Sequence, residues 1–172
     1  LAWKSYLNQI GKTDVTVCMP DAYPDFLQWL PEANTVLRYD KNPEKVQETF
    51  NRADLVCCLD FNQYARVEAM RSTLEGCKAK RILIDHHLEP QTDNAITISQ
   101  PNMSSTSEMI FYIISQLGGY NNMTKDCAQC IYCGMMTDTG GFTYNSTRPE
   151  IYFVIGQLLS KGIDKDNIYN RV

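Results

Sequence analysis

Five short apolar runs recur along the chain and predict strands. Each run has four or five residues, is rich in aliphatic side chains, and ends near polar or turn-forming residues. The runs lie at residues 15–19, 35–38, 55–59, 81–84 and 95–98. The run at 55–59, Leu-Val-Cys-Cys-Leu, shows no alternation of polar and apolar side chains, so we expect a fully buried strand there.

Longer stretches between these runs repeat apolar side chains every three or four residues, which is typical of helices. We expect helices at residues 2–10, 43–51, 63–77, 105–117, 124–136 and 149–161, with glycines near several of their ends. Strands that alternate with helices predict an α/β fold, a mostly parallel sheet flanked by helices on both faces. No linker or repeat interrupts the pattern, so we expect residues 1–172 to form one domain.

Acidic and imidazole side chains follow the apolar segments at three places. They are Asp60, the run Asp85-His86-His87, and Asp138. A single Asp at such a position is most simply a turn or cap residue. In parallel sheets, however, ligands bind beyond the carboxyl ends of the strands. Because both histidines of the chain fall in one of the three clusters, we favour a divalent metal site, and these ligand types suit Mn²⁺ or Mg²⁺.

Composition narrows the classes of function. With 44% hydrophobic and 21% charged residues, the chain is typical of a globular protein rather than a disordered tail or a coiled coil. Its 16 basic and 20 acidic residues give a net charge of −4, which argues against a duplex-DNA binder. No apolar run reaches the roughly 18 residues that a membrane-spanning helix needs. Seven cysteines without a secretory signal indicate reduced thiols, so we expect a cytoplasmic protein.

Three motifs, in order along the chain, resemble those of the DHH phosphoesterase family. Ile84-Asp85-His86-His87 is similar to the motif that names the family, and Thr137-Asp138-Thr139-Gly140-Gly141-Phe142 is similar to its later Asp-Thr-Gly-x-Phe motif. Leu59-Asp60-Phe61-Asn62 lies where the family has a single Asp at a strand end. The sequence most resembles the nanoRNase branch, whose members cleave short oligonucleotides and dephosphorylate adenosine 3',5'-bisphosphate. Exopolyphosphatase-related proteins and cyclic-dinucleotide phosphodiesterases share these motifs.

The resemblance implies two Mn²⁺ ions, with Mg²⁺ as an alternative, that act together on a phosphate group. By the same resemblance, Asp60 bridges the two ions, and His86 and Asp138 are both ligands of one of them. His87 lies near the scissile phosphate, and Asp85 orients an imidazole without contacting the metal itself. The implied nucleophile is a hydroxide, which is available near neutral pH because bound cations lower the pKa of water.

Two parts of the family pattern are missing from the sequence. The first motif, His-x-x-Pro-Asp-x-Asp on the first strand, is absent, and residues 1–4 resemble the helix that follows it. The C-terminal substrate-binding domain of the family is absent as well. We therefore expect a DHH domain that is incomplete at its N-terminal strand and impaired as an enzyme on its own. A strand-wide gap is expected between the strands at 15–19 and 55–59.

The leading function is a manganese-dependent phosphoesterase that hydrolyses short oligoribonucleotides or small phosphorylated nucleotides. The expected partner is therefore a small nucleotide or a short single-stranded RNA, and the resemblance also allows a homodimer. The alternatives are an exopolyphosphatase or pyrophosphatase, a cyclic-dinucleotide phosphodiesterase, and a non-catalytic binding fragment. A nucleotide substrate would need a base-stacking pocket, and polyphosphate would not.

Two weaker features concern substrate binding. Ser105 and Glu108 have the spacing of a capping box at a helix start. The N–H groups of the same helix start, at Ser105 and Thr106, could also face a substrate phosphate. Arg66 could contact phosphate from the helix after Asp60, although a hydrated helix face is its default interpretation.

Cysteines at positions 127, 130 and 133 have the Cys-x-x-Cys-x-x-Cys spacing of an iron–sulfur protein. The same spacing places all three near one face of a helix, among Ile131, Met135 and Met136. A buried helix face is the favoured interpretation, since the sequence offers neither a Cys-Pro pair nor a distant fourth ligand.

Overall fold

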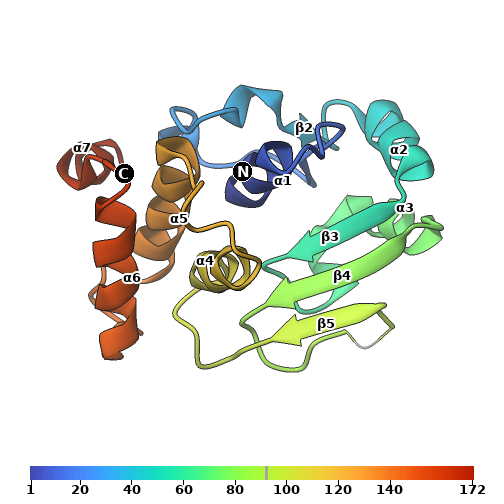
Figure 1. The fold of residues 1–172 in the computed structure, drawn as a ribbon. Helices are drawn as coiled ribbons and strands as arrows, with labels where there is room; N and C mark the ends of the chain where they lie inside the picture. The colour runs from blue at the N-terminus through green and yellow to red at the C-terminus, as the bar shows by residue number, and fades with distance from the viewer. Residues whose placement is uncertain (92) are drawn as a thin grey trace. The chain divides into compact units, whose positions relative to one another are not determined.

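The computed structural model describes residues 1–91 and 93–172 and divides into two compact units. The first, which we call the helical unit, contains Leu1–Val15, Pro24–Asn34 and Met103–Val172. The second, which we call the sheet unit, contains Thr16–Tyr23 and Thr35–Asn102. All strand pairs in the described residues are parallel, which confirms the predicted α/β class (Figure 1).

Three strands of the sheet unit form a parallel sheet in the order β3 (Leu55–Leu59), β4 (Lys80–Asp85) and β5 (Ile96–Ser99) (Figure 1). They match three of the predicted strands to within one residue at each end. The register pairs Leu59 with Ile84. The carboxyl ends of β3 and β4, where the predicted site residues follow, therefore lie at one edge of the sheet.

The expectation that β3 is fully buried is wrong. Leu55 is 49% exposed, and Cys58 is the one fully buried residue of this strand. The cause is its place in the sheet: among the described residues, β4 is the partner on one side of β3, and no strand pairs with the other side. An edge strand keeps part of its surface accessible.

The other two predicted strands are reduced to a short pair, β1 (Cys18–Met19) and β2 (Leu37–Arg38). Pro20 follows β1 directly, and its carbonyl still accepts a hydrogen bond from the Asp40 N–H at 3.1 Å. In the described part of the chain β1 pairs with β2 and not with β3. The additional strand expected between β1 and β3 stays a prediction.

The core of the sheet unit lies between the sheet and three helical segments, α2 (Pro43–Arg52), η3 (Tyr64–Met70) and α3 (Arg71–Gly76). Cys58 and Leu83, which are register partners on β3 and β4, form its sheet side. The helical side consists of Val46, Phe50, Tyr64, Val67, Met70 and Leu74. The core thus anchors both strands that lead to the candidate site.

The continuous helix predicted at 63–77 is wrong in detail, because its first half is a 3₁₀ segment. Tyr64, Val67 and Met70 are all buried, and a three-residue spacing of this kind is compatible with one face of either an α-helix or a 3₁₀ helix. Glu68, between them, has a positive φ of 44° and kinks the segment. This kink, and not the apolar spacing, interrupts the continuous helix.

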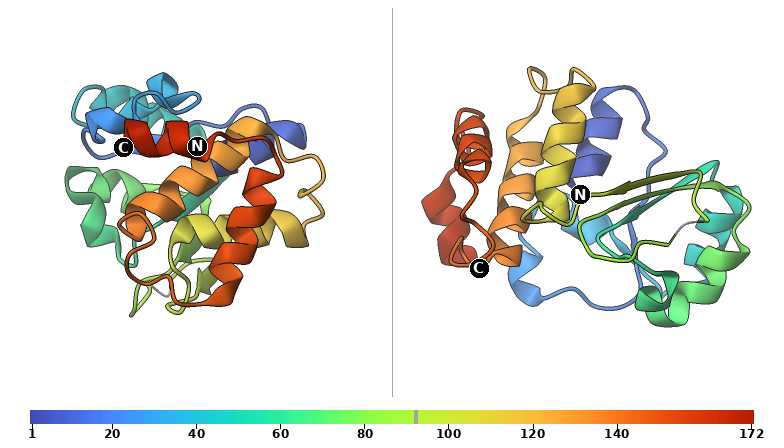
Figure 2. Two further views of the ribbon diagram at one scale, coloured as in Figure 1. Left: turned by 90° about the vertical axis from the view of Figure 1, so that its left-hand side faces the viewer. Right: turned by 90° about the horizontal axis from the view of Figure 1, so that it is seen from below.

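The helical unit is built around α5 (Lys125–Asp138). Four helices contact it: α1 (Ala2–Gln9), α4 (Thr106–Gln116), α6 (Pro149–Leu159) and α7 (Lys165–Arg171). Figure 2 shows α4 and α5 side by side. Gly134 of α5 lies against Ser107 of α4. A Cβ atom on this glycine would lie 2.0 Å from the Ser107 hydroxyl oxygen, so the helices approach this closely only with glycine here.

The three cysteines of α5 lie on its buried side, as predicted. Cys127, Cys130 and Cys133 are at most 9% exposed. Burial raises the pKa of Cys130 to about 12 and the pKa values of Cys127 and Cys133 to about 11, so the thiols stay protonated. A protonated thiol is a poor metal ligand, so these cysteines serve the packing of α5.

The periodicity did not predict α7, which has one buried residue, Ile168. Its start had a local signal that could have been used: Asp164 follows Gly162, and its carboxylate accepts a hydrogen bond from the Asn167 N–H. No helix among the described residues combines the length and the hydropathy needed to cross a membrane.

Candidate metal centre

Asp60 is the first residue after β3, and its backbone is unusual. Its φ is +67°, in the left-handed region that non-glycine residues rarely adopt, although Asp tolerates it better than most. Its N–H donates to the Ile84 carbonyl, at 3.1 Å, and this bond extends the β3–β4 ladder by one residue. Its side chain is 57% exposed. The strand end therefore turns the carboxylate outward in a conformation typical of functional sites.

Asp85 is the last residue of β4, and its carboxylate is completely buried. It accepts two hydrogen bonds from His87: one from the backbone N–H at 3.0 Å, and one from the ring Nδ1 at 2.7 Å. Since a carboxylate accepts, Nδ1 carries the ring proton. The Nε2 atom of His87 then has the lone pair available for a cation or for a substrate proton.

Asp60, His86 and His87 form one cluster at the carboxyl edge of the sheet. Each side chain offers one ligand atom, and these atoms lie within 4.8 Å of one another. The Nε2 atom of His86 is 3.7 Å from the Asp60 carboxylate, and the two imidazole rings meet edge to face with centroids 4.7 Å apart. Ligands about 2.1 Å from a common ion are about 3 to 4.2 Å apart, so the Asp60–His86 spacing fits a shared divalent cation.

The type of ligand also fits. Imidazole nitrogens with a carboxylate oxygen suit Mn²⁺ and other divalent first-row metals, and carboxylate oxygens also suit Mg²⁺. Among the described residues, this is the one group of three or more His, Cys, Asp or Glu side chains with metal-binding spacing. A possible divalent metal site is thus present in the sheet unit.

Asp138 belongs to the helical unit, as the exposed last residue of α5. Its predicted role as a ligand beside His86 therefore stays a prediction. The turn after it is tight: Gly140, Gly141 and Phe142 all have positive φ. Thr139, which is buried, holds this turn by donating to the Met135 carbonyl at 2.7 Å and accepting from the Phe142 N–H at 3.0 Å. The Gly-Gly pair of the motif is explained by this left-handed run.

The predicted substrate-binding residues lie in both units. Ser105 and Thr106 are buried at the start of α4 in the helical unit, and Arg66 is an exposed residue of η3 in the sheet unit. The Ser105 hydroxyl accepts from the Glu108 N–H at 3.0 Å, so it caps the helix as expected. The phosphate contacts proposed for these three residues stay predictions.

A buried ion pair beside this cap was not expected. Glu108 is completely buried, and its carboxylate accepts from the Ser104 N–H at 2.7 Å, rather than from Ser105 as a capping box requires. Arg148, at the start of α6, donates to the same carboxylate at 3.0 Å. The pair joins residues 40 positions apart, and no short-range pattern indicates such a link.

Comparison with known proteins places these observations in a family. The family model described as "DHH family, N-terminal domain" matches residues 1–135. The bifunctional oligoribonucleases and PAP phosphatases NrnA of Bacillus subtilis and Thermus thermophilus are 27% and 28% identical over 98% and 96% of this chain. The matches cover 52% and 46% of those two proteins. The chain therefore spans about half the length of these curated relatives.

A solved structure is also similar to this chain. The crystal structure of an exopolyphosphatase-related protein from Bacteroides fragilis is 47% identical, with a TM-score of 0.96. The match covers 99% of this chain and 50% of that protein.

Proposed function

Because this chain belongs to the DHH family, we propose that it forms the metal-binding part of a manganese-dependent phosphoesterase. The proposed substrates are short oligoribonucleotides and small phosphorylated nucleotides such as adenosine 3',5'-bisphosphate. This proposal rests mainly on one observation: Asp60, His86 and His87 converge at the carboxyl ends of β3 and β4. The oligoribonuclease and PAP phosphatase activities for which the two NrnA relatives are named support the substrate class.

We assign the roles of the side chains as follows. Asp60 would be shared by the two cations, and His86 and Asp138 would ligate one of them. Asp85 holds the His87 ring through Nδ1, so that Nε2 faces the scissile phosphate or a cation. When bound, the cations would lower the pKa of water and neutralise the charge that develops on the phosphate. The remaining ligands of a two-metal site would lie outside residues 1–172, and the protein would act in the cytoplasm.

The test compares this chain with the longer protein proposed to carry it. Each is titrated with Mn²⁺ by calorimetry and assayed for mononucleotide release from a three-residue RNA. We expect the longer protein to bind two Mn²⁺ ions and to hydrolyse the RNA. The chain alone should bind Mn²⁺ weakly and hydrolyse little RNA. Tight binding of two ions by the chain alone would contradict the shared ligand set. No Mn²⁺-dependent turnover by the longer protein would favour a non-catalytic role.

A second candidate is the hydrolysis of inorganic polyphosphate, because the similar structure from Bacteroides fragilis is an exopolyphosphatase-related protein. The two candidates share the metal centre and differ in whether a base is recognised. An inhibition assay with competing ligands distinguishes the two candidate substrates. If RNA is the substrate, mononucleotides should inhibit far better than tripolyphosphate; the reverse order, together with phosphate release from polyphosphate, would favour the second candidate.

A further inference from the structure

A return loop follows His87 and leads back toward β5; its described residues are 88–91 and 93–95. The loop has little apolar anchorage near the site. Leu88 is 71% exposed, and Glu89 has a positive φ of 56°. Its position relative to Asp60 must therefore come from polar contacts.

Asn62, two residues after Asp60, makes these contacts at the near end of the loop. Its side-chain Nδ2 donates to the Leu88 carbonyl at 2.7 Å, and its own carbonyl accepts from the Gln91 N–H at 2.6 Å. The amide orientation follows from this pattern, because a flipped amide would place two oxygens face to face. One residue thus binds the loop through both its side chain and its backbone.

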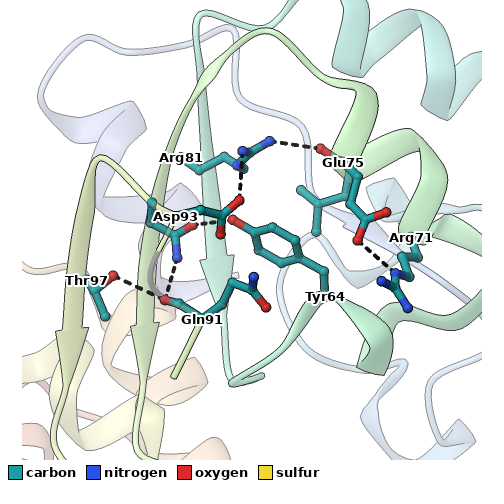
Figure 3. Close-up of polar contacts among 9 residues, drawn as sticks. Tyr64, Arg71, Glu75, Arg81, Gln91, Asp93 and Thr97 are labelled. Atoms are coloured by element: carbon teal, nitrogen blue, oxygen red, sulfur yellow. Dashed lines mark hydrogen bonds and ion pairs between the residues drawn. The ribbon is translucent and has the colours of Figure 1, made fainter. Parts of the chain in front are cut away.

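Tyr64 makes the equivalent contact at the far end. Its hydroxyl donates to the Asn94 Oδ1 atom at 2.6 Å, and Asn94 donates to the Gln91 carbonyl at 2.9 Å. Figure 3 shows this network, in which the Arg81 guanidinium lies 5.3 Å from the centre of the Tyr64 ring and 3.3 Å from Asp93. Burial raises the pKa of Tyr64 to about 12, so the hydroxyl keeps its proton.

We propose that Asn62 is a positioning residue that sets the separation between Asp60 and the two imidazoles. Leu88 follows His87 directly, and Asn62 is two residues from Asp60, so the 2.7 Å bond closes a short frame around the cluster. The other side of this frame is the bond from the Asp60 N–H to the Ile84 carbonyl. The β3–β4 ladder fixes the two strand ends up to this bond, and the Asn62–Leu88 bond adds a fixed point beyond the cluster.

The Asn62 side chain is not arranged for stability alone. Its Oδ1 atom is buried and has no hydrogen-bond partner among the described residues. A buried unpaired oxygen is destabilising, and Leu has nearly the same shape as Asn without this oxygen. Asn62→Leu should therefore change the overall stability little, because the lost Leu88 bond is offset by removal of the unpaired atom. This separates positioning from stability.

The experiment uses the metal-free chain, in which the two histidines are the only sources of imidazole NMR signals. Long-range ¹H–¹⁵N spectra are recorded for the unmodified chain, for Asn62→Leu, and for the matched control Tyr64→Phe. The control removes one hydrogen bond from the far end of the same loop. Asn62→Ala is the second variant if Asn62→Leu does not fold.

For the unmodified chain we expect two sharp sets of imidazole signals and slow exchange of the Gln91 amide. In Asn62→Leu the imidazole signals should broaden or converge, and Gln91 exchange should accelerate at least tenfold. Tyr64→Phe should leave the imidazole signals in place even if it lowers the melting temperature. Unchanged imidazole signals in both Asn62 variants, or equal changes in the control, would overturn the proposal.

That this frame holds metal ligands at a fixed separation rests on the proposed function. A Mn²⁺ titration of the same samples tests the positioning role and the metal function separately. If the unmodified chain shows no Mn²⁺ effect while Asn62→Leu disturbs the imidazoles, the positioning role stands and the proposed metal function is contradicted for this chain. If Mn²⁺ binds the unmodified chain and Asn62→Leu equally and the imidazoles are undisturbed, the positioning role is overturned while the metal function stands.

Discussion

Two groups of three side chains are of types that ligate metals elsewhere, one made of cysteines and one of Asp and His, and they differ in burial and in what surrounds them. Cys127, Cys130 and Cys133 lie inside the helical unit, with thiol pKa values raised to about 11 or 12 by burial. Asp60, His86 and His87 lie at two strand ends of the sheet unit.

The difference lies in what surrounds each group. The cysteines have no charged partner that favours the thiolate over the thiol strongly enough to offset burial. The imidazole of His87 is oriented by a buried carboxylate, and Asp60 is turned outward by a left-handed backbone. Residue type and spacing are thus insufficient to identify a metal site; access for the ion and orientation of the ligands decide.

The largest expected effect comes from Asp60. In the longer protein, Asp60→Asn should lower Mn²⁺-dependent hydrolysis on the order of a thousandfold, or about 4 kcal/mol, because a bridging carboxylate neutralises two cations at once. Steady-state release of mononucleotide measures the loss. Asp54→Asn, before the opposite end of β3, is the control and should leave the rate unchanged. Full activity of Asp60→Asn would remove this residue from the mechanism.

His86→Ala should have the next largest effect, a loss of activity of about a hundredfold with weaker Mn²⁺ binding. The fold should remain intact, since His86 follows β4 and is not part of the hydrophobic core of the sheet unit. Calorimetric titration gives the metal affinity, and far-ultraviolet circular dichroism reports the fold. An unchanged Mn²⁺ affinity would show that His86 is not a ligand.

Asp85→Asn should reduce activity by about ten- to a hundredfold, the usual range for a residue that orients a ligand. The amide that replaces the carboxylate would present an N–H group to His87 or lose one of the two hydrogen bonds at 2.7 and 3.0 Å. Histidine NMR should then show a mixture of ring tautomers at His87. A retained single tautomer with full activity would contradict the orienting role.

The contribution of the three cysteines to the free energy of unfolding should depend on pH and not on Mn²⁺. Because their pKa values are raised from the ordinary value of 9.0, the folded state favours the neutral thiols. The stability they contribute is complete below pH 9 and is lost as pH rises from 9 toward 11 or 12, by up to about 1 kcal/mol for each thiol between pH 9 and 10. Denaturant unfolding at pH 8, 9 and 10 measures this loss.

The control is Cys130→Ala. This variant should show a smaller loss of unfolding free energy per pH unit above pH 9, with an unchanged affinity for Mn²⁺. A lower Mn²⁺ affinity in this variant would break the distinction between the two groups of side chains.

Short-range pattern was sufficient for much of the fold. The predicted strands at 55–59, 81–84 and 95–98 and the helices at α2, α4 and α6 agree with the structure to within one or two residues. These elements are defined by side chains a few positions apart, so a local window contains the necessary information. The sequence pattern predicted an α-helix where η3 is a 3₁₀ segment, because the periods of 3.6 and 3.0 residues per turn differ little over seven residues.

The sequence alone determined which residues follow the apolar strands, and so it placed Asp60, His86 and His87 at this edge as candidate metal-binding groups. It did not determine their orientation. The left-handed turn at Asp60, the buried carboxylate behind His87 and the Asn62–Leu88 bond, which joins residues 26 positions apart, appear only in the folded chain. Such contacts depend on strands that first pair across long loops, and only tertiary packing supplies the free energy that closes those loops.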